Sequence, residues 1–190
     1  MLKINIILLA SGYSRRFNGN KLLTELNNKP LYMHIIDKVI NMNFNKVICV
    51  TQYEEIKRNL NNTGIHVIIN ENSDLGISNS IKLGIDFDKD ADGYMFMVCD
   101  QPFIKKETLK KLIDIFETSN KGIVAIGNES IIGNPVIFSR NYVDELLSLK
   151  GDTGGKKIVK RHLDDLELID VKDELEFIDI DTKEIYERFK

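Results

Sequence analysis

The sequence predicts an α/β fold in which a doubly wound, mostly parallel sheet carries helices on both faces, and two observations support this prediction. Continuous aliphatic runs, such as Lys3–Leu9 and Tyr94–Cys99, are typical of strands that are buried on both faces. Segments with apolar residues at helical spacing alternate with these runs, which is the pattern of successive β-α-β units. Short connections between the later strands indicate a small antiparallel edge or subsheet.

The elements follow in order from the spacing of apolar residues. A loop rich in Gly, Asn and Ser over residues 10–29 follows the first strand, and Pro30 then opens a helix because its fixed φ suits the first helical position. Strands are predicted next at 46–51, 65–69, 94–99, 122–126 and 135–138, with further apolar runs at 166–171 and 177–180. Helices are predicted at 53–60, 77–85, 105–118, 141–149, 154–162 and 182–189. This order indicates a Rossmann-like arrangement.

Length and composition limit the class of protein. The chain has 190 residues, of which 43% are hydrophobic and 29% charged, and it fits one domain over residues 1–190 with an ordinary core. A net charge of −3 disfavours a dedicated nucleic-acid binder, which usually carries a basic excess. The apolar run near the N-terminus is too short to span a membrane, and the two cysteines fit buried, reduced thiols. We therefore expect a cytoplasmic protein with neither a membrane partner nor a nucleic-acid partner.

Charge is distributed unevenly between the two ends of the chain. Residues 1–60 hold nine Lys or Arg against four Asp or Glu, whereas residues 164–190 hold eleven acidic residues against four basic ones. Such an asymmetry is typical of an anionic ligand at one end and also of solvated helix faces.

The loop after the first predicted strand carries the strongest chemical signal. Residues 10–21 read ASGYSRRFNGNK and combine small residues with two arginines and a lysine. Open parallel sheets bind ligands beyond the carboxyl ends of their strands, where backbone N–H groups and Arg or Lys side chains hold phosphates. The spacings GxxxxGK[ST] and GxGxxG are both missing, which disfavours a Walker loop and a dinucleotide fingerprint. The composition suits a triphosphate, and it also suits a solvated basic loop.

The run LLASGYSRRFNGNKLL resembles the signature LAAGxSxRMGxxKLL of the molybdenum-cofactor nucleotidyltransferases, and we refer to residues 10–21 as the signature loop. Ser11, Phe17 and Asn18 depart from the signature, and Asn18 stands where Gly is usual, although Asn tolerates a left-handed turn. The resemblance extends from residue 4 to about 188 and implies a fold of the nucleotide-diphospho-sugar transferase type. It implies a nucleotide site made of Ala10, Ser11, Gly12, Ser14, Arg16, Lys21, Gly76, Ser78, Ser80 and Asp100, with Arg16, Lys21 and Asp100 as the catalytic residues.

Asp100 follows a predicted central strand in the segment Cys99-Asp100-Gln101-Pro102. Mg²⁺ prefers one or two carboxylates, with phosphate oxygens and water in its other positions. The family places its metal-binding Asp in a matching D-x-P segment, so the resemblance implies that Asp100 binds Mg²⁺. The alternative is an N-cap of the helix that begins near Lys105, and the spacing disfavours it.

Three later segments extend the resemblance. DLGISNSI at 74–81 resembles the G-x-S-x-S segment that lies beside the base and ribose, while GNPVIF at 133–138 and GDTGGK at 151–156 resemble segments that face the acceptor. The implied acceptor-binding residues are Gln101, Pro102, Asn134, Pro135, Asp152 and Gly154. Asp152 is equally a candidate for contact with the metal and for the N-cap of the helix at 154–162.

The acidic tail contains IDIDT at 178–182, which resembles a closing D-x-D-T element of the family. Asp179 or Asp181 would complete the Mg²⁺ site, and we assign Asp181 as the second ligand beside Asp100. Asp181 also suits the N-cap of the closing helix.

The implied reaction is nucleotidyl transfer, in which an acceptor phosphate attacks the α-phosphorus of a nucleoside triphosphate and pyrophosphate leaves. Positioning and charge stabilisation carry such a reaction, with Arg16 and Lys21 on the β- and γ-phosphates. The Asp100-Gln101-Pro102 segment matches the cytidylyl branch of the family, which favours transfer of CMP from CTP to the phosphate of molybdenum-loaded molybdopterin. A molybdenum hydroxylase apoenzyme is then a candidate partner that receives the product.

Three alternatives stay open at this point. The first is a guanylyltransferase that uses GTP on the same acceptor, because Ser11 fits neither branch of the family. The second is a cytidylyltransferase that acts on another small phosphate. The third is a non-catalytic regulator that binds a nucleotide without turnover.

Overall fold

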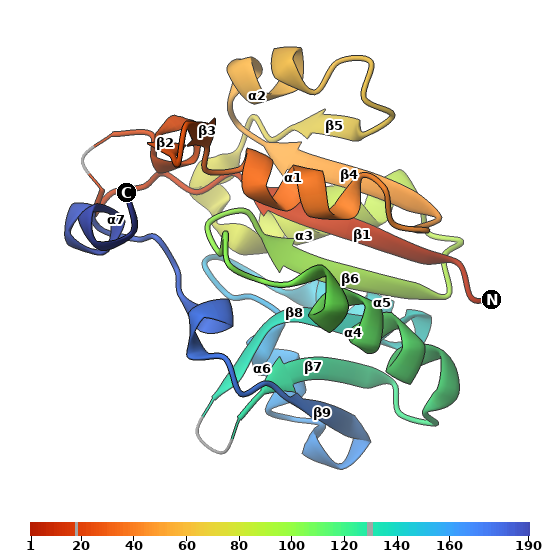
Figure 1. Cartoon of the computed structure of the whole chain (residues 1–190). Coiled ribbons are helices and arrows are strands. Elements are labelled where there is room, and N and C mark those ends of the chain that lie inside the picture. The colour runs from red at the N-terminus through yellow and green to blue at the C-terminus, as the bar shows by residue number, and fades with distance from the viewer. Residues whose placement is uncertain (18, 129–130) are drawn as a thin grey trace.

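A seven-stranded sheet forms the centre of the computed structural model, which describes residues 1–17, 19–128 and 131–190 (Figure 1). The strand order is β5-β4-β1-β6-β8-β7-β9, and β2 and β3 form a separate two-stranded sheet. The strands are β1 Ile4–Ala10, β2 Glu25–Leu26, β3 Lys29–Pro30, β4 Lys46–Thr51, β5 His66–Ile69, β6 Gly93–Val98, β7 Ile123–Gly127, β8 Ile132–Ser139 and β9 Leu166–Asp170.

The sheet is mostly parallel, as the sequence predicts. Strand β1 pairs in parallel with β4 on one side and with β6 on the other, and β9 pairs in parallel with β7. Strand β8 is antiparallel to both β6 and β7, which is the antiparallel part that the short late connections indicate. From β1 the chain passes to β4 and β5 on one side and then returns to β6 on the other, so β1 stands at the point where the strand order reverses.

Helices cover both faces of the sheet (Figure 1). Ile6 and Leu8 of β1 point to one face and Ile7 to the other, because successive side chains of a strand alternate. The first face packs against α1 (Met33–Val39), α2 (Glu54–Asn59), α4 (Lys106–Thr118) and α7 (Lys183–Phe189). The second packs against α3 (Ile77–Phe87), α5 (Val143–Ser148) and α6 (Lys156–Val159).

The predicted helix start at Pro30 is wrong. Asn27 and Asn28 have φ of +51° and +61°, and this turn folds the chain into a short hairpin in which Pro30 pairs with Glu25. Asn is one of the few residues that accept a positive φ, which suits it to tight hairpin turns. Helix α1 therefore begins only at Met33.

The C-terminal part also differs from the prediction. Residues 174–177 form a one-turn 3-10 helix, and the predicted run at 177–180 is no strand of the sheet. The run instead lies beside the segment that follows β6, where the Ile180 amide donates to the Asp100 carbonyl at 2.9 Å. The predicted helix at 154–162 is shortened to α6, which covers Lys156–Val159.

The C-terminal segment brings the acidic end of the chain against the basic start. Figure 1 shows α7 beside β2 and β3, far from it in sequence. The ring of Tyr186 meets Phe17 edge-on with centroids 5.7 Å apart, and its hydroxyl donates to the Glu25 carbonyl at 2.6 Å. The two ends of the chain are therefore joined by an aromatic contact and a hydrogen bond.

Cys49 and Cys99 are free thiols and both are buried, as predicted. Over residues 1–17, 19–128 and 131–190, none of the helices has the length and apolar character that a membrane span requires.

Candidate active site

A cavity of about 460 Å³ opens at the carboxyl ends of β1 and β6, where the reversal of strand order favours ligand binding. The signature loop supplies much of its wall, and Asp100 lies at the end of β6. The cavity is lined by Leu9, Ser11, Gly12, Tyr13, Ser14, Arg15, Arg16, Lys21, Leu22, Ser73, Asp74, Gly76, Ile77, Ser80, Val98, Asp100, Asp152 and Asp181.

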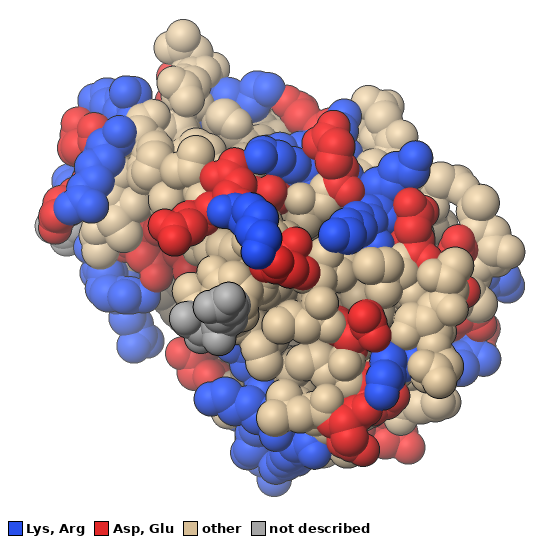
Figure 2. Space-filling view, turned by 60° about the horizontal axis from the view of Figure 1, so that its bottom comes forward, with Lys and Arg blue, Asp and Glu red and all other residues tan. Residues whose placement is uncertain are grey.

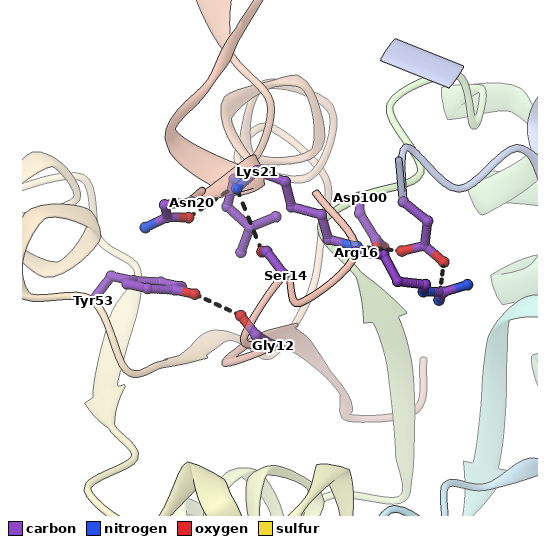
Figure 3. Close-up of polar contacts among 9 residues, drawn as sticks. Gly12, Ser14, Arg16, Asn20, Lys21, Tyr53 and Asp100 are labelled. Atoms are coloured by element: carbon purple, nitrogen blue, oxygen red, sulfur yellow. Dashed lines mark hydrogen bonds and ion pairs between the residues drawn. The ribbon is translucent and has the colours of Figure 1, made fainter. Parts of the chain in front are cut away.

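The fold of the signature loop follows from local hydrogen bonds (Figure 3). Ser14 has a φ of +52°, and its carbonyl accepts from the Phe17 amide at 2.9 Å, which closes a tight turn. The Asn20 side chain accepts from the Leu22 amide and caps the one-turn helix Lys21–Leu23. Phe17 is buried and anchors the loop, so its replacement of the usual Met keeps an apolar contact. The predicted turn role of Asn18 lies outside the described residues.

Lys21 lies at the centre of a charged cluster that joins the loop to β6 and the C-terminal segment (Figure 3). Its Nζ lies 2.5 Å from Asp100 Oδ2 and 2.5 Å from Asp181 Oδ1. Arg16 reaches the other oxygen of Asp181 at 2.7 Å. The side chain of Lys21 is only 10% exposed, whereas that of Arg16 is 73% exposed. The ion pairs of Lys21 are therefore sheltered from water, whereas Arg16, although paired with Asp181, is exposed to solvent.

Burial and neighbouring charges shift the pKa values of Lys21 and Asp179. Burial alone would lower the pKa of Lys21, but the attraction of Asp100 and Asp181 outweighs it and the pKa lies above its ordinary value. Asp179 behaves in the opposite way: burial and the neighbouring charges of Asp100 and Asp181 raise its pKa to about 6. An excess of carboxylates therefore gathers beside one lysine.

The residues present fit a divalent cation. Asp100 Oδ1 is buried, and within the described part of the chain it has no hydrogen-bond partner, which leaves an oxygen to be satisfied. Asp181 presents a second carboxylate to the same point, since both carboxylates contact Lys21 Nζ. The described residues contain no group of three or more His, Cys, Asp or Glu suited to a metal. Two carboxylates are sufficient for Mg²⁺ when phosphate oxygens supply the other positions.

The three aspartates that sequence spacing left as candidate helix caps do not cap helices. The N-cap residue is Lys105 in α4, Gly155 in α6 and Thr182 in α7. Asp100, Asp152 and Asp181 line the cavity instead.

A second cavity of about 410 Å³ adjoins the first, and Asp100, Asp181 and Val98 line both. Gln101 and Asn134, two of the predicted acceptor-binding residues, lie in its wall. Its lining residues are Val98, Asp100, Gln101, Ile131, Gly133, Asn134, Lys156, Phe177, Asp179 and Asp181. Asp100 and Asp181 thus lie where the two cavities meet.

Some of the predicted site residues do not line the cavity for which they were predicted. Ala10, Ser78, Pro102, Pro135 and Gly154 line neither cavity, and Asp152 lies in the first cavity rather than the second. The peptide bond between Asn134 and Pro135 is cis.

Gly76 allows the segment of residues 74–81 to pack closely against the loop at 151–152. Its φ is +83°, and a Cβ at this position would stand 2.5 Å from the Gly151 carbonyl carbon and 2.6 Å from the Asp152 amide nitrogen. The Ser78 amide donates to the Gly151 carbonyl at 3.2 Å. Only glycine fits both the positive φ and the close approach.

Sequence reasoning missed several residues of the site. Tyr13, Ser73 and Asp74 line the first cavity, and Phe177 lines the second. Residues 51–53, at the carboxyl end of β4, hydrogen-bond the signature loop. The available signal was topological, because the ends of neighbouring parallel strands meet at one edge of the sheet.

Charge on the surface is mixed in sign. Figure 2 shows basic and acidic side chains next to one another near the centre of one face. In the cavity itself, Arg15, Arg16 and Lys21 face Asp100 and Asp181. The basic side chains that line the first cavity all belong to the signature loop.

The fold and the site together define a class of protein. A cationic loop after β1, Asp100 after β6 and Asp181 from the C-terminal segment meet at the switch point of an open α/β sheet. This arrangement suits the binding of a nucleotide with its phosphates and a metal. Residues 6–166 match the model of the MobA-like NTP transferase domain, and the chain belongs to this family. The match covers most of the chain, from the first strand to the last, and so includes the signature loop and Asp100.

Two curated relatives illustrate the range of the similarity. The bifunctional protein GlmU of Thermosipho melanesiensis is 26% identical over 157 residues, which are 82% of this chain and 34% of that protein. A probable molybdenum cofactor guanylyltransferase of Thermococcus sibiricus is 30% identical over 116 residues, which are 60% of this chain and 56% of that protein. The chain thus spans about a third of the GlmU relative and about half of the guanylyltransferase.

Solved structures show the same fold. Rv0371c from Mycobacterium tuberculosis H37Rv superposes with a TM-score of 0.86 at 23% identity, covering 99% of this chain and 97% of that chain. Another structure of that protein, described as a complex with manganese, gives a TM-score of 0.83 at 23% identity over 98% and 97% of the two chains. The fold is that of the nucleotide-diphospho-sugar transferases, as expected.

Proposed function

We propose that this chain, acting as one domain over residues 1–190, transfers a nucleotidyl group from a nucleoside triphosphate to the phosphate of molybdenum-loaded molybdopterin. The products are pyrophosphate and a molybdopterin dinucleotide. One observation carries the proposal: Asp100 and Asp181 stand between two cavities, with Lys21 bridging them from the signature loop. Such a reaction requires a triphosphate and a phosphate acceptor on opposite sides of a charged centre.

The chain's own groups have separate roles in this proposal. The signature loop holds the triphosphate, with Lys21 and Arg16 on the β- and γ-phosphates, where positive charge stabilises the departing pyrophosphate. Ser80 lines the first cavity, and we assign it to the base and ribose. Gln101 and Asn134 hold the acceptor in the second cavity. An acceptor phosphate is already ionised at neutral pH, so no side chain needs to remove a proton from it.

Mg²⁺ is the metal we propose, held by Asp100 and Asp181. When bound, a divalent cation neutralises charge on phosphate oxygens and helps to orient them. Asp100 Oδ1, which has no hydrogen-bond partner among the residues that the structure describes, supports this assignment. The manganese complex of Rv0371c is consistent with a divalent metal.

The base of the nucleotide has two candidates, each with its own support. The Asp100-Gln101-Pro102 segment favours CTP, because it matches the cytidylyl branch. The relatives from Thermococcus sibiricus and Pyrococcus horikoshii, which are named as probable molybdenum cofactor guanylyltransferases, favour GTP at least as much. A molybdenum hydroxylase apoenzyme would receive the cytosine form of the product.

The test is a transfer assay with purified protein, molybdenum-loaded molybdopterin, Mg²⁺ and either CTP or GTP, read out as pyrophosphate release. We expect release with one of the two nucleotides and only in the presence of acceptor. Release with GTP but not CTP would select the guanylyl form. A second acceptor arm with other small phosphates tests the acceptor. Turnover only with these would overturn molybdopterin as the substrate, and no turnover with any acceptor would overturn the transfer itself.

A further inference from the structure

Three consecutive side chains at the carboxyl end of β4 donate hydrogen bonds to three consecutive carbonyls of the signature loop. Thr51 Oγ1 donates to the Ala10 carbonyl at 3.0 Å, Gln52 Nε2 donates to the Ser11 carbonyl at 2.7 Å, and the Tyr53 hydroxyl donates to the Gly12 carbonyl at 2.6 Å. Figure 3 shows the last of these contacts, with the Tyr53 ring directed at Gly12. The strands β1 and β4 are parallel neighbours with Ala10 opposite Thr51, so the two segments leave the sheet side by side.

These bonds fix which way the peptide groups face. In a planar trans peptide the carbonyl of one residue and the N–H of the next point in opposite directions. Because the carbonyls of residues 10, 11 and 12 are held by residues 51–53, the N–H groups of Ser11, Gly12 and Tyr13 are directed away from that segment. All three residues line the first cavity.

The three N–H groups are available to a ligand. Across residues 1–17, 19–128 and 131–190, the amides of Ser11, Gly12 and Tyr13 donate to no protein acceptor. Gly12 and Tyr13 are exposed, and a row of backbone N–H groups with one orientation is a typical cradle for phosphate oxygens.

The orientation of Gln52 is itself held from the other side. Ser73 Oγ lies 3.2 Å from Gln52 Oε1 and 2.8 Å from the Tyr13 hydroxyl, and Ser73 is buried. A rotated Gln52 amide would bring its oxygen toward the Ser11 carbonyl and its NH₂ toward Ser73. The network therefore favours the rotamer that donates to the loop.

We infer that Gln52 and Tyr53 are positioning residues, which hold the Ser11 and Gly12 carbonyls so that the N–H groups of Gly12 and Tyr13 receive triphosphate oxygens. The inference rests on the proposed function, because it explains how the N–H groups that would bind the triphosphate are oriented. Neither side chain touches the phosphates in this account. Their removal costs affinity because the loop must then be ordered by the ligand itself.

The experiment measures the binding of CTP, GTP and inorganic tripolyphosphate by calorimetry, with Mg²⁺ present, for wild type, Tyr53→Phe and Gln52→Met. Tyr32→Phe is the matched control. The Tyr32 hydroxyl accepts a hydrogen bond from Asn59 of α2, the helix that Tyr53 caps, and within the described residues it makes no hydrogen bond to the signature loop. One lost hydrogen bond weakens the binding of tripolyphosphate and nucleotide by about three- to tenfold. In the transfer assay the KM for nucleotide rises by a similar factor while the KM for acceptor stays the same. Thermal unfolding of Tyr53→Phe stays close to wild type.

The outcomes separate the inference from the function on which it rests. Equal affinities in wild type and both variants would overturn the inference while leaving the transfer reaction in place. A loss with CTP or GTP but not with tripolyphosphate would also overturn it, because the network would then act on the base. A wild-type protein that binds none of the three probes would overturn the proposed function, and the inference with it.

Discussion

Lys21 Nζ lies 2.5 Å from Asp100 Oδ2, and this contact joins the loop after β1 to the segment that follows β6. The same ammonium group contacts Asp181, so it stands at the point where we place the metal. A nucleotide with its metal would therefore have to compete with Lys21 for both carboxylates. In the proposed function Lys21 then moves to the phosphates, which its flexible stem allows.

Replacement of Asp100 by Asn removes one negative charge and keeps the shape of the side chain. We expect nucleotidyl transfer to fall at least about a hundredfold, because metal stabilisation of phosphate charge contributes several kcal/mol to the transition state. Circular dichroism should show a wild-type fold. Asp90→Asn, at an exposed turn, is the control and should transfer at the wild-type rate. Near-normal activity of Asp100→Asn would contradict its role as metal ligand.

Replacement of Lys21 by Met tests the buried ion pairs. The variant leaves Asp100 and Asp181 without their shared cation, and we expect the free energy of unfolding to fall by about 3 kcal/mol. Lys29→Met is the control, since Lys29 pairs with Asp37 where both side chains are more than 40% exposed, and its loss should be below about 1 kcal/mol. Urea denaturation measures both. Equal losses in the two variants would show that the Lys21 cluster is no more than a surface pair.

Replacement of Gly76 by Ala tests the close approach of this residue to the loop at 151–152. The added Cβ meets the Gly151 backbone, and we expect a loss of about 3 kcal/mol in stability, from backbone strain and overlap together. Gly64→Ala is a closely matched control, because Gly64 has the same φ of +83° but nothing within 4 Å of its added Cβ. Its cost should be about 1 kcal/mol, from strain alone. A Gly76 variant as stable as the Gly64 variant would contradict the close approach.

Asp88 links stability to pH at the opposite end of the sheet from the site. Burial alone would raise its pKa, but hydrogen bonds from Lys46, Asn5 and the Asp90 amide outweigh this and lower the pKa to about 2. Because the folded pKa lies below the unfolded value near 4, the stabilisation is complete above pH ~4 and is lost as the pH falls toward 2.

We expect Asp88→Asn to be less stable than wild type at pH 7, by about 1–3 kcal/mol, and to lose less stability between pH 4 and 2. Thermal unfolding across this pH range is the measurement, with Asp86→Asn as an exposed control. A wild-type slope in the Asp88 variant would contradict the assignment.

Much of the fold could be predicted from the sequence because it depends on local pattern. Continuous apolar runs gave β1, β4 and β6 to within a residue or two. The hairpin at Glu25–Pro30 was missed because its strands are two residues long and its turn depends on the positive φ of Asn27 and Asn28. The 177–180 run was misjudged because one hydrogen bond to Asp100 replaces a strand ladder.

The site could be predicted only where a contiguous motif carried it. Lys21, Arg16 and Asp100 come together in the structure, and Asp181 joins them from the tail. The contacts of Gln52 and Tyr53 with the loop depend on which strands are neighbours, and no local pattern states this. Ala10 and Ser78 illustrate the reverse case, since they lie in matching motifs but outside the cavity walls.

The most direct test of the central claim follows a radioactive label from the nucleotide to its product. The protein is incubated with Mg²⁺, molybdenum-loaded molybdopterin and the nucleoside triphosphate that supports pyrophosphate release, labelled at either the α- or the γ-phosphorus. Nucleotidyl transfer predicts that α-label appears in the molybdopterin product and γ-label only in pyrophosphate. Transfer of γ-label to the acceptor, or α-label that stays in free nucleotide, would contradict it.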